Sequence, residues 1–106
     1  MSEFLVVYIT ASGDNAKDLA SALVREKLAA CVNRVPGVES TYIWEGRVER
    51  DTEDLLIVKT RTDLFDRLKQ RVQTLHDYDV PEIIGVPIDQ GSESYLEWMT
   101  ASMSKD

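Results

Sequence analysis

Two unbroken runs of apolar, β-favouring residues constrain the fold of this chain more than any other feature. They are Phe4–Ile9 and Leu55–Val58. A strand with one face in water alternates apolar and polar residues, whereas a continuous apolar run is typical of a strand that is buried on both faces. We therefore expect these two segments to be the central strands of a sheet.

Two further strand-like segments contain proline. Pro36-Gly37 interrupts the segment Cys31–Trp44, and Pro87 stands near the end of the segment Glu82–Ile88. Proline donates no hydrogen bond to a neighbouring strand, so a strand that contains it lies at a sheet edge or has a bulge there. The two segments are therefore predicted to be the edges of the sheet.

The dipeptide Glu45-Gly46 predicts a hairpin turn, although it is a weaker turn signal than Asn-Gly. The turn joins Cys31–Trp44 to a returning strand, Arg47–Thr60. The outer half of that strand, Val48–Asp54, is polar. We expect a long hairpin with a polar tip that projects beyond the core.

Three segments have apolar residues at helical spacing, preceded by capping signals at Ser12–Asp14, Thr62-Asp63 and Ser94. Their stripes are Ala16, Leu19, Ala20 and Leu23; Leu64, Phe65, Leu68, Val72 and Leu75; and Leu96, Met99 and Met103. The element order is β-α-β-β-α-β with a C-terminal helix. It predicts the α+β class and a ferredoxin-like antiparallel sheet of strand order 4-1-3-2, with both long helices on one face.

The length of 106 residues predicts a single domain, 1–106. Such a small core gives a monomer modest stability, so we expect an oligomer. The net charge of −7 argues against nucleic acid and anionic membrane partners. A single cysteine, the absence of a basic leader and the absence of a long apolar run predict a cytoplasmic protein without a membrane span.

Cys31 and His76 are the candidate metal ligands, because thiolate and imidazole bind soft metals. The alternatives are a small buried hydrophobe for Cys31 and a residue that complements a helix dipole for His76. The predicted topology puts the two at opposite ends of the sheet, so we expect any soft-metal site to be weak and to lie between subunits. Enzyme signatures such as a Walker loop, GxSxG, CxxC and HExxH are absent from the sequence, which predicts a non-enzymatic protein.

Aromatic residues near turns form a second set of candidates. Tyr42, Trp44 and Tyr78 are of the type enriched at interfaces, with packing on the chain's own sheet as the alternative. Acidic residues gather at Glu49–Asp54 and at Asp77–Glu82, where oxygen ligands suit hard cations. Because neither cluster has the spacing of a Ca²⁺ loop, we interpret both as solvated flanks and loop caps.

The residues from Val6 to Trp98 resemble the CutA divalent-cation-tolerance proteins. The resemblance rests chiefly on Glu26–Asn33, Ser40–Gly46, Ile57–Thr60, Leu75–Ile83 and Tyr95–Trp98. It implies a homotrimer built like the PII signalling proteins, a link to copper and other divalent metals, and no catalysed reaction. Candidate residues of its inter-subunit cleft or interface are Tyr42, Trp44, Lys59, Tyr78 and Glu82.

Two functions remain open at this point. The first is a non-enzymatic trimer that acts in divalent-cation tolerance, with a copper or other metal ion as ligand. The alternative is a PII-like signalling or scaffold trimer that binds a small ligand or a protein. An RNA-binding domain on this fold is disfavoured because Leu55–Val58 offers no aromatic or basic residue, and a small hydrolase because its motifs are missing.

Overall fold

The computed structural model describes residues 2–104, so the ends of the predicted domain 1–106 lie outside the described residues. The elements are β1 (Phe4–Ala11), α1 (Gly13–Arg25), β2 (Cys31–Trp44), β3 (Arg47–Arg61), a 3-10 turn η1 (Thr62–Leu64), α2 (Phe65–Leu75), β4 (Ile83–Pro87) and α3 (Glu93–Ser102). No helix within residues 2–104 is long and apolar enough to cross a membrane.

The four strands form one antiparallel sheet in the order β2-β3-β1-β4. Both apolar runs are central and both proline-containing strands are edges, so the predicted α+β topology is confirmed. The ladder between β2 and β3 shifts register between Val35 and Val38, where Gly37 has a φ of 75°. This bulge accommodates Pro36, which has no N–H for the ladder.

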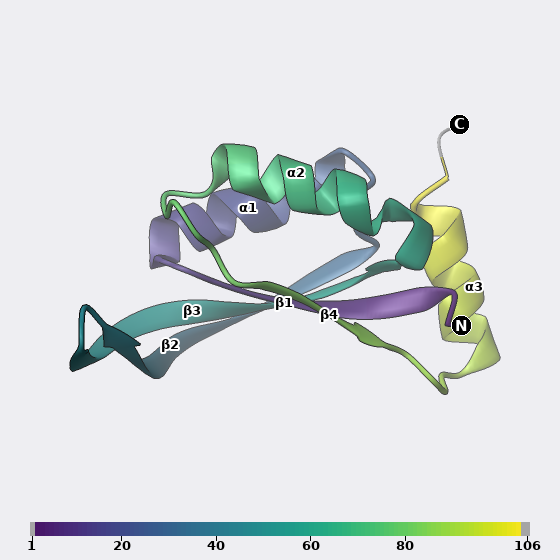
Figure 1. The fold of residues 1–106 in the computed structure, drawn as a ribbon. Helices are drawn as coiled ribbons and strands as arrows, with labels where there is room; N and C mark the ends of the chain where they lie inside the picture. The colour runs from purple at the N-terminus through teal and green to yellow at the C-terminus, as the bar shows by residue number, and fades with distance from the viewer. Residues whose placement is uncertain (1, 105–106) are drawn as a thin grey trace.

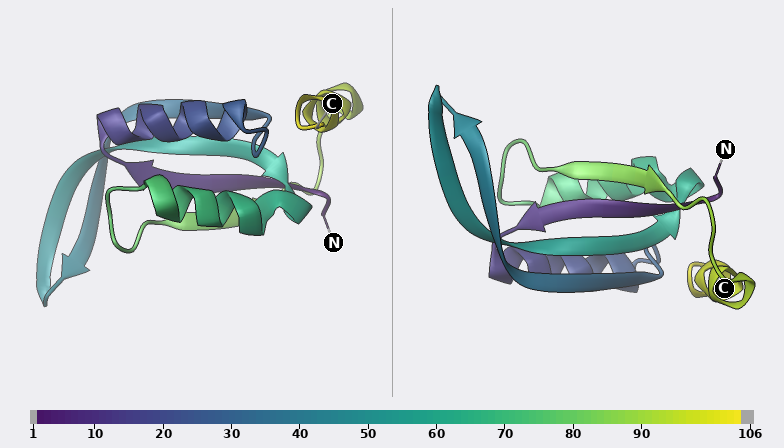
Figure 2. Two further views of the ribbon diagram at one scale, coloured as in Figure 1. Left: turned by 90° about the horizontal axis from the view of Figure 1, so that it is seen from above. Right: turned by 90° about the horizontal axis from the view of Figure 1, so that it is seen from below.

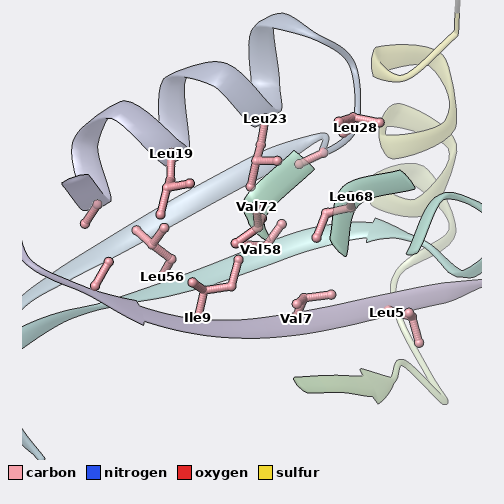
Figure 3. Close-up of a cluster of buried hydrophobic side chains, with 13 residues drawn as sticks. Leu5, Val7, Ile9, Leu19, Leu23, Leu28, Leu56, Val58, Leu68 and Val72 are labelled. Atoms are coloured by element: carbon pink, nitrogen blue, oxygen red, sulfur yellow. The ribbon is translucent and has the colours of Figure 1, made fainter. Parts of the chain in front are cut away.

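Helices α1 and α2 cover one face of the sheet (Figure 1), and the main core lies between them and the strands (Figure 3). Side chains alternate along each strand, so only every second residue of β1 and β3 enters this core. Its largest fully buried side chains include Ile9, Leu19, Leu23, Leu56, Leu68 and Val72. A smaller cluster under α3 contains Phe4, Ala30, Met99 and Met103.

The second face of the sheet has no helix over it within residues 2–104, as the view from below shows (Figure 2). The prediction that the central strands are buried on both faces is therefore wrong for a single chain. The uncovered residues are nevertheless largely apolar; we call them the open face, and they include Val6, Tyr8, Val35, Leu55, Ile57, Ile84 and Val86.

The outer part of the β2–β3 hairpin, residues 38–53, projects beyond the helices (Figure 1), and we call it the arm. Its turn has positive φ angles of 51° at Glu45 and 77° at Gly46. Two consecutive positive φ angles are those of a type I′ turn, whose twist suits a two-residue hairpin. The predicted hairpin and its projection are confirmed, but the predicted polar tip is wrong, because Ile43, Trp44 and Val48 are exposed beside the turn.

Two predicted helix starts need correction. Thr62 and Asp63 begin the turn η1 instead of capping α2, and Asp63 forms an ion pair with Arg61 at 2.7 Å. Helix α3 begins at Glu93, so Ser94 lies inside it rather than at its cap. Both differences are local and leave the topology unchanged.

Candidate functional site

A groove of about 560 Å³ lies between the arm and the loop that joins α2 to β4. Its lining combines aromatic and acidic side chains with the end of β1: Thr10, Tyr42, Trp44, Glu49, Asp51, Glu53, Tyr78, Asp79, Val80 and Glu82. None of these residues is basic. The groove is therefore suited to a cation or to a ligand with a positively charged group.

Strand alternation builds the arm wall of the groove. Tyr42 lies opposite Glu49 in the β2–β3 ladder, and its hydroxyl donates a hydrogen bond to Asp51. That bond to a carboxylate, with smaller contributions from burial and neighbouring charge, raises the pKa of Tyr42 to about 12. The phenol therefore remains a hydrogen-bond donor at neutral pH.

The opposite wall is anchored by Tyr78. Its hydroxyl donates to Oε2 of Glu53 at 3.1 Å, and Glu53 is only 7% exposed. Burial raises the pKa of Tyr78 to about 12, and the bond to the Glu53 carboxylate contributes to the shift. This contact connects the loop to the base of the arm and fixes the width of the groove.

His76 holds this loop in place. Its Nε2 lies 2.8 Å from the backbone oxygen of Thr10, and its Nδ1 lies 3.0 Å from the backbone nitrogen of Tyr78. A carbonyl only accepts and an amide N–H only donates, so in this arrangement Nε2 is the donor to Thr10 and Nδ1 is the acceptor from Tyr78. His76 is buried and follows the last residue of α2 in an extended conformation. His76 is thus the C-cap of α2, as expected of a residue at the end of that helix, and its ring bonds to backbone groups of β1 and of the loop.

Asn15 gives the loop a second attachment. Its side-chain amide donates to the backbone oxygen of Leu75 at 3.1 Å and accepts from the backbone nitrogen of Asp77 at 3.2 Å. The backbone on both sides of His76 is therefore fixed to α1. Sequence patterns alone gave no sign of this role, because a buried asparagine in the first turn of a helix resembles an ordinary capping residue.

The acidic run Glu49–Asp54 is divided between the two faces of β3. Glu53 contributes to the groove, whereas Asp54 is buried on the other side and pairs with Arg34 at 2.7 Å. The interpretation of the whole run as a solvated flank is therefore wrong for these two residues. The sequence did contain a signal for the acidic wall of the groove: Glu49, Asp51 and Glu53 alternate along a strand and therefore lie on the same side of it as Tyr42.

Cys31 and Lys59 lie apart from the groove, on the open face. They are directly opposite each other in the β2–β3 ladder, and the Lys59 ammonium donates to the Asn33 side chain. The Cys31 thiol is partly exposed and lies close to Tyr95 of α3. Burial raises the pKa of Tyr95, and the nearby Cys31 adds to that shift.

The structure therefore brings together four of the five residues predicted for a cleft. Tyr42, Trp44, Tyr78 and Glu82 line one groove, and Lys59 does not. The loop residue Asp79 and the arm carboxylates also belong to the groove. Both ring nitrogens of His76 are hydrogen-bonded to the backbone, one to Thr10 of β1 and one to Tyr78 of the loop. The imidazole therefore holds the loop against β1 and does not line the groove.

A copper centre does not fit the residues of a single chain. His76 bonds to Thr10, whose strand partner is Leu55, whereas Cys31 pairs with Lys59. Four residues along β3 separate these positions by roughly 13 Å. His76 would also have to give up a hydrogen bond to bind a metal. Residues 2–104 contain no group of three His, Cys, Asp or Glu side chains placed to hold a metal ion.

Comparison with known proteins gives consistent matches. Residues 5–102 match the family described as CutA1 divalent ion tolerance protein. The chloroplastic protein CutA of Arabidopsis thaliana is 54% identical over 99 residues, 92% of this chain and 54% of that protein. The divalent-cation tolerance protein CutA of Thermus thermophilus is 50% identical over 97 residues, 92% of this chain and 94% of that protein.

Solved structures agree with these matches. The crystal structure of CutA1 from Oryza sativa has a TM-score of 0.94 and 49% identity, covering 99% of this chain and 97% of that one. The chain spans about half the length of the Arabidopsis and Oryza curated relatives and nearly all of the Thermus protein. The resemblance found in the sequence is therefore confirmed.

Proposed function

Because the chain belongs to the CutA1 divalent ion tolerance family, we propose that it acts as a non-enzymatic homotrimer in divalent-cation tolerance, copper included. In this proposal, metal ions bind weakly in clefts between subunits. The chain works in the cytoplasm, which its single cysteine supports because a lone cysteine forms no disulfide within the chain. Of the relatives named above, the Thermus thermophilus protein carries the terms divalent cation and tolerance in its own description.

The open face is the observation that supports assembly most strongly. Ile84 is 52% exposed, and Val35 and Val86 are each 41% exposed, around the partly buried Tyr8 and Ile57. A contiguous apolar surface of this kind on a soluble chain marks an interaction site. A second copy of the same sheet would supply the missing layer and bury the second side of both central strands.

The edges and the arm support a threefold arrangement. β2 and β4 end the sheet with unpaired backbone groups, and a contact repeated around a threefold axis satisfies every edge in the same way. The arm also ends in apolar side chains that its own subunit leaves in water, with Ile43 at 66% and Trp44 at 60% exposure. In the proposed trimer, the arm reaches a neighbouring subunit and is partly covered there.

The metal part of the proposal requires donors from more than one chain. Each subunit offers Cys31 on its open face and the groove carboxylates, while His76 could join only by giving up one of its bonds. Thiolate prefers soft metals such as Cu(I), and carboxylates prefer harder ions. A site with few ligands, part thiolate and part carboxylate, binds any one metal ion weakly. Weak binding supports a role in responding to metal ions rather than in storing them.

The groove favours one alternative. A PII-like signalling or scaffold trimer would hold a small ligand or a protein segment in its inter-subunit clefts. A concave site of about 560 Å³ with aromatic walls is within the size range of small-molecule pockets. Under this alternative, tolerance to metals is an indirect consequence of signalling.

Native mass spectrometry on the purified chain tests both versions. We expect a trimer mass, and after addition of Cu(I) or Zn²⁺ we expect metal adducts that a chelator removes easily. Cys31→Ser should weaken the Cu(I) adduct more than the Zn²⁺ adduct. Ser40→Ala, a substitution on the arm, is the control for differences in sample preparation. A monomer mass at micromolar concentration contradicts the assembly, and wild-type Cu(I) binding by Cys31→Ser contradicts the thiolate site. A trimer that retains an organic molecule instead favours the alternative.

A further inference from the structure

The arm buries no side chain in its own subunit until it reaches its base. None of residues 38–52 is buried, whereas the next two residues, Glu53 and Asp54, are only 7% and 6% exposed. Elements with few buried contacts are those that move most easily relative to the rest of a domain. The direction of the arm is therefore fixed by the contacts that residues 53 and 54 make.

The base of the arm coincides with the irregularity in the β2–β3 ladder. The register shifts between Val35 and Val38, and Gly37 has a φ of 75°. Because Pro36 has no N–H to donate, regular pairing is interrupted on β2 just before the arm begins. A strand bends at a bulge. We call residues 35–38 the hinge, since the arm and the body of the sheet each keep their own pairing on either side of it.

Asp54 holds the hinge on the helix-covered face of the sheet. Its Oδ2 accepts a hydrogen bond from Nη1 of Arg34 at 2.7 Å, and its Oδ1 accepts one from the backbone nitrogen of Gly37 at 3.4 Å. A Cβ at Gly13 would lie 3.6 Å from Oδ2, so the carboxylate also packs against the first residue of α1. One buried carboxylate thus connects the hinge to β2 and to the start of a helix by a charge-assisted bond and close packing.

Glu53 holds the arm from the opposite face. Adjacent residues of a strand point to opposite sides of the sheet, and the Glu53 carboxylate accepts the Tyr78 hydroxyl of the loop after α2 at 3.1 Å. The base of the arm is therefore attached on both faces, to β2 and α1 on one side and to the loop on the other. We call the hydrogen bonds of Glu53 and Asp54 together the latch.

We infer that the arm is a hinged element whose angle to the sheet is set by the latch. With both carboxylates engaged, the arm projects as Figure 1 shows. Loss of either contact allows the arm to tilt at the hinge without unpairing β2 from β3. The angle controls the width of the groove, because Tyr42 and Trp44 belong to the arm and Tyr78 to the loop. It also controls where the tip meets a second copy of the chain, and that consequence alone rests on the proposed function.

Electron spin resonance on pairs of spin labels measures the angle. Labels at Arg47→Cys near the tip and Lys17→Cys on α1, both exposed positions, report the distance from tip to body in a Cys31→Ser background. The labelled chain is refolded with a large excess of unlabelled chain, so that only distances within one chain contribute. Residues 38–44 span about 20 Å at roughly 3.3 Å per residue, so a tilt of about 10° moves the tip by roughly 3–4 Å.

Asp54→Asn should broaden the distribution of distances, because the charged partner of Arg34 is lost. Tyr78→Phe removes only the hydroxyl bonded to Glu53 and should broaden it as well; this variant decides the question alone if Asp54→Asn does not fold. The matched control is Asp51→Asn, whose carboxylate bonds within the arm and does not cross the hinge. Wild-type widths in both latch variants overturn the inference. Equal broadening by the control also overturns it, since the whole arm would then be loosened.

Mass measurement on the same samples separates this inference from the proposed function. A trimer in which both latch variants keep the wild-type distribution contradicts the latch alone. A monomer in which both variants broaden it contradicts the proposed assembly and leaves the latch standing.

Discussion

Replacement of His76 by alanine should lower the free energy of unfolding by about 2–3 kcal/mol. The imidazole is buried, donates to the Thr10 carbonyl at 2.8 Å and accepts from the Tyr78 amide at 3.0 Å. Each such bond contributes about 1 kcal/mol net, and the buried ring adds packing that alanine does not replace. The loss is therefore about twice that of an average hydrogen-bond deletion.

Two partial replacements test the assignment of each nitrogen. A glutamine at position 76 has an amide that reaches like Nε2 and donates to Thr10, and an asparagine has an oxygen that accepts like Nδ1 from Tyr78. His76→Gln and His76→Asn should each lose about half as much stability as His76→Ala. Equal losses in all three variants would show that packing, rather than hydrogen bonding, dominates.

Urea unfolding followed by circular dichroism measures these differences, at one protein concentration because the stability of an oligomer depends on it. The series should be run in EDTA. If His76→Ala lies within about 0.5 kcal/mol of the wild type, the structural role is refuted, because that is the range of a neutral surface substitution. If EDTA lowers the wild type to the level of the variant, His76 acts through a bound metal instead.

Three further predictions concern the open face, the turn and the groove. Tyr8→Glu places a charge in the open face between Ile57 and Ile84, and light scattering should show a fall to the monomer mass; an unchanged mass would contradict the proposed interface. Glu45→Asn should raise stability to thermal unfolding by about 0.5–1 kcal/mol, since asparagine tolerates the φ of 51° better, and a lower melting temperature would refute this. The raised pKa of Tyr42 means that its bond to Asp51 stabilises the fold below pH 10, its usual pKa, and that this contribution is lost as pH rises through about 12. Asp51→Asn should move that titration back toward its usual range in an ultraviolet absorbance titration, and an unshifted curve would argue against the contact.

Much of the fold was predictable because its signals are local. Pro36-Gly37 produced a bulge, Glu45-Gly46 produced the turn, and the apolar runs became the central strands. Each of these outcomes depends on the backbone preferences of a few adjacent residues. The grouping of Tyr42, Trp44 and Tyr78 has no such local signal, because it requires the loop after α2 to approach the arm.

What the sequence determined by itself is the order of the elements, the strand order, the family and the chemical character of the candidate residues. Only the tertiary structure decided that His76 supports the groove, that Glu53 and Asp54 face opposite sides, and that the apolar residues of the open face have no cover within residues 2–104. The physical reason is that these properties depend on contacts between residues far apart in the chain. Thr10 and His76 are an example, because their hydrogen bond forms only after β1 and α2 have packed together.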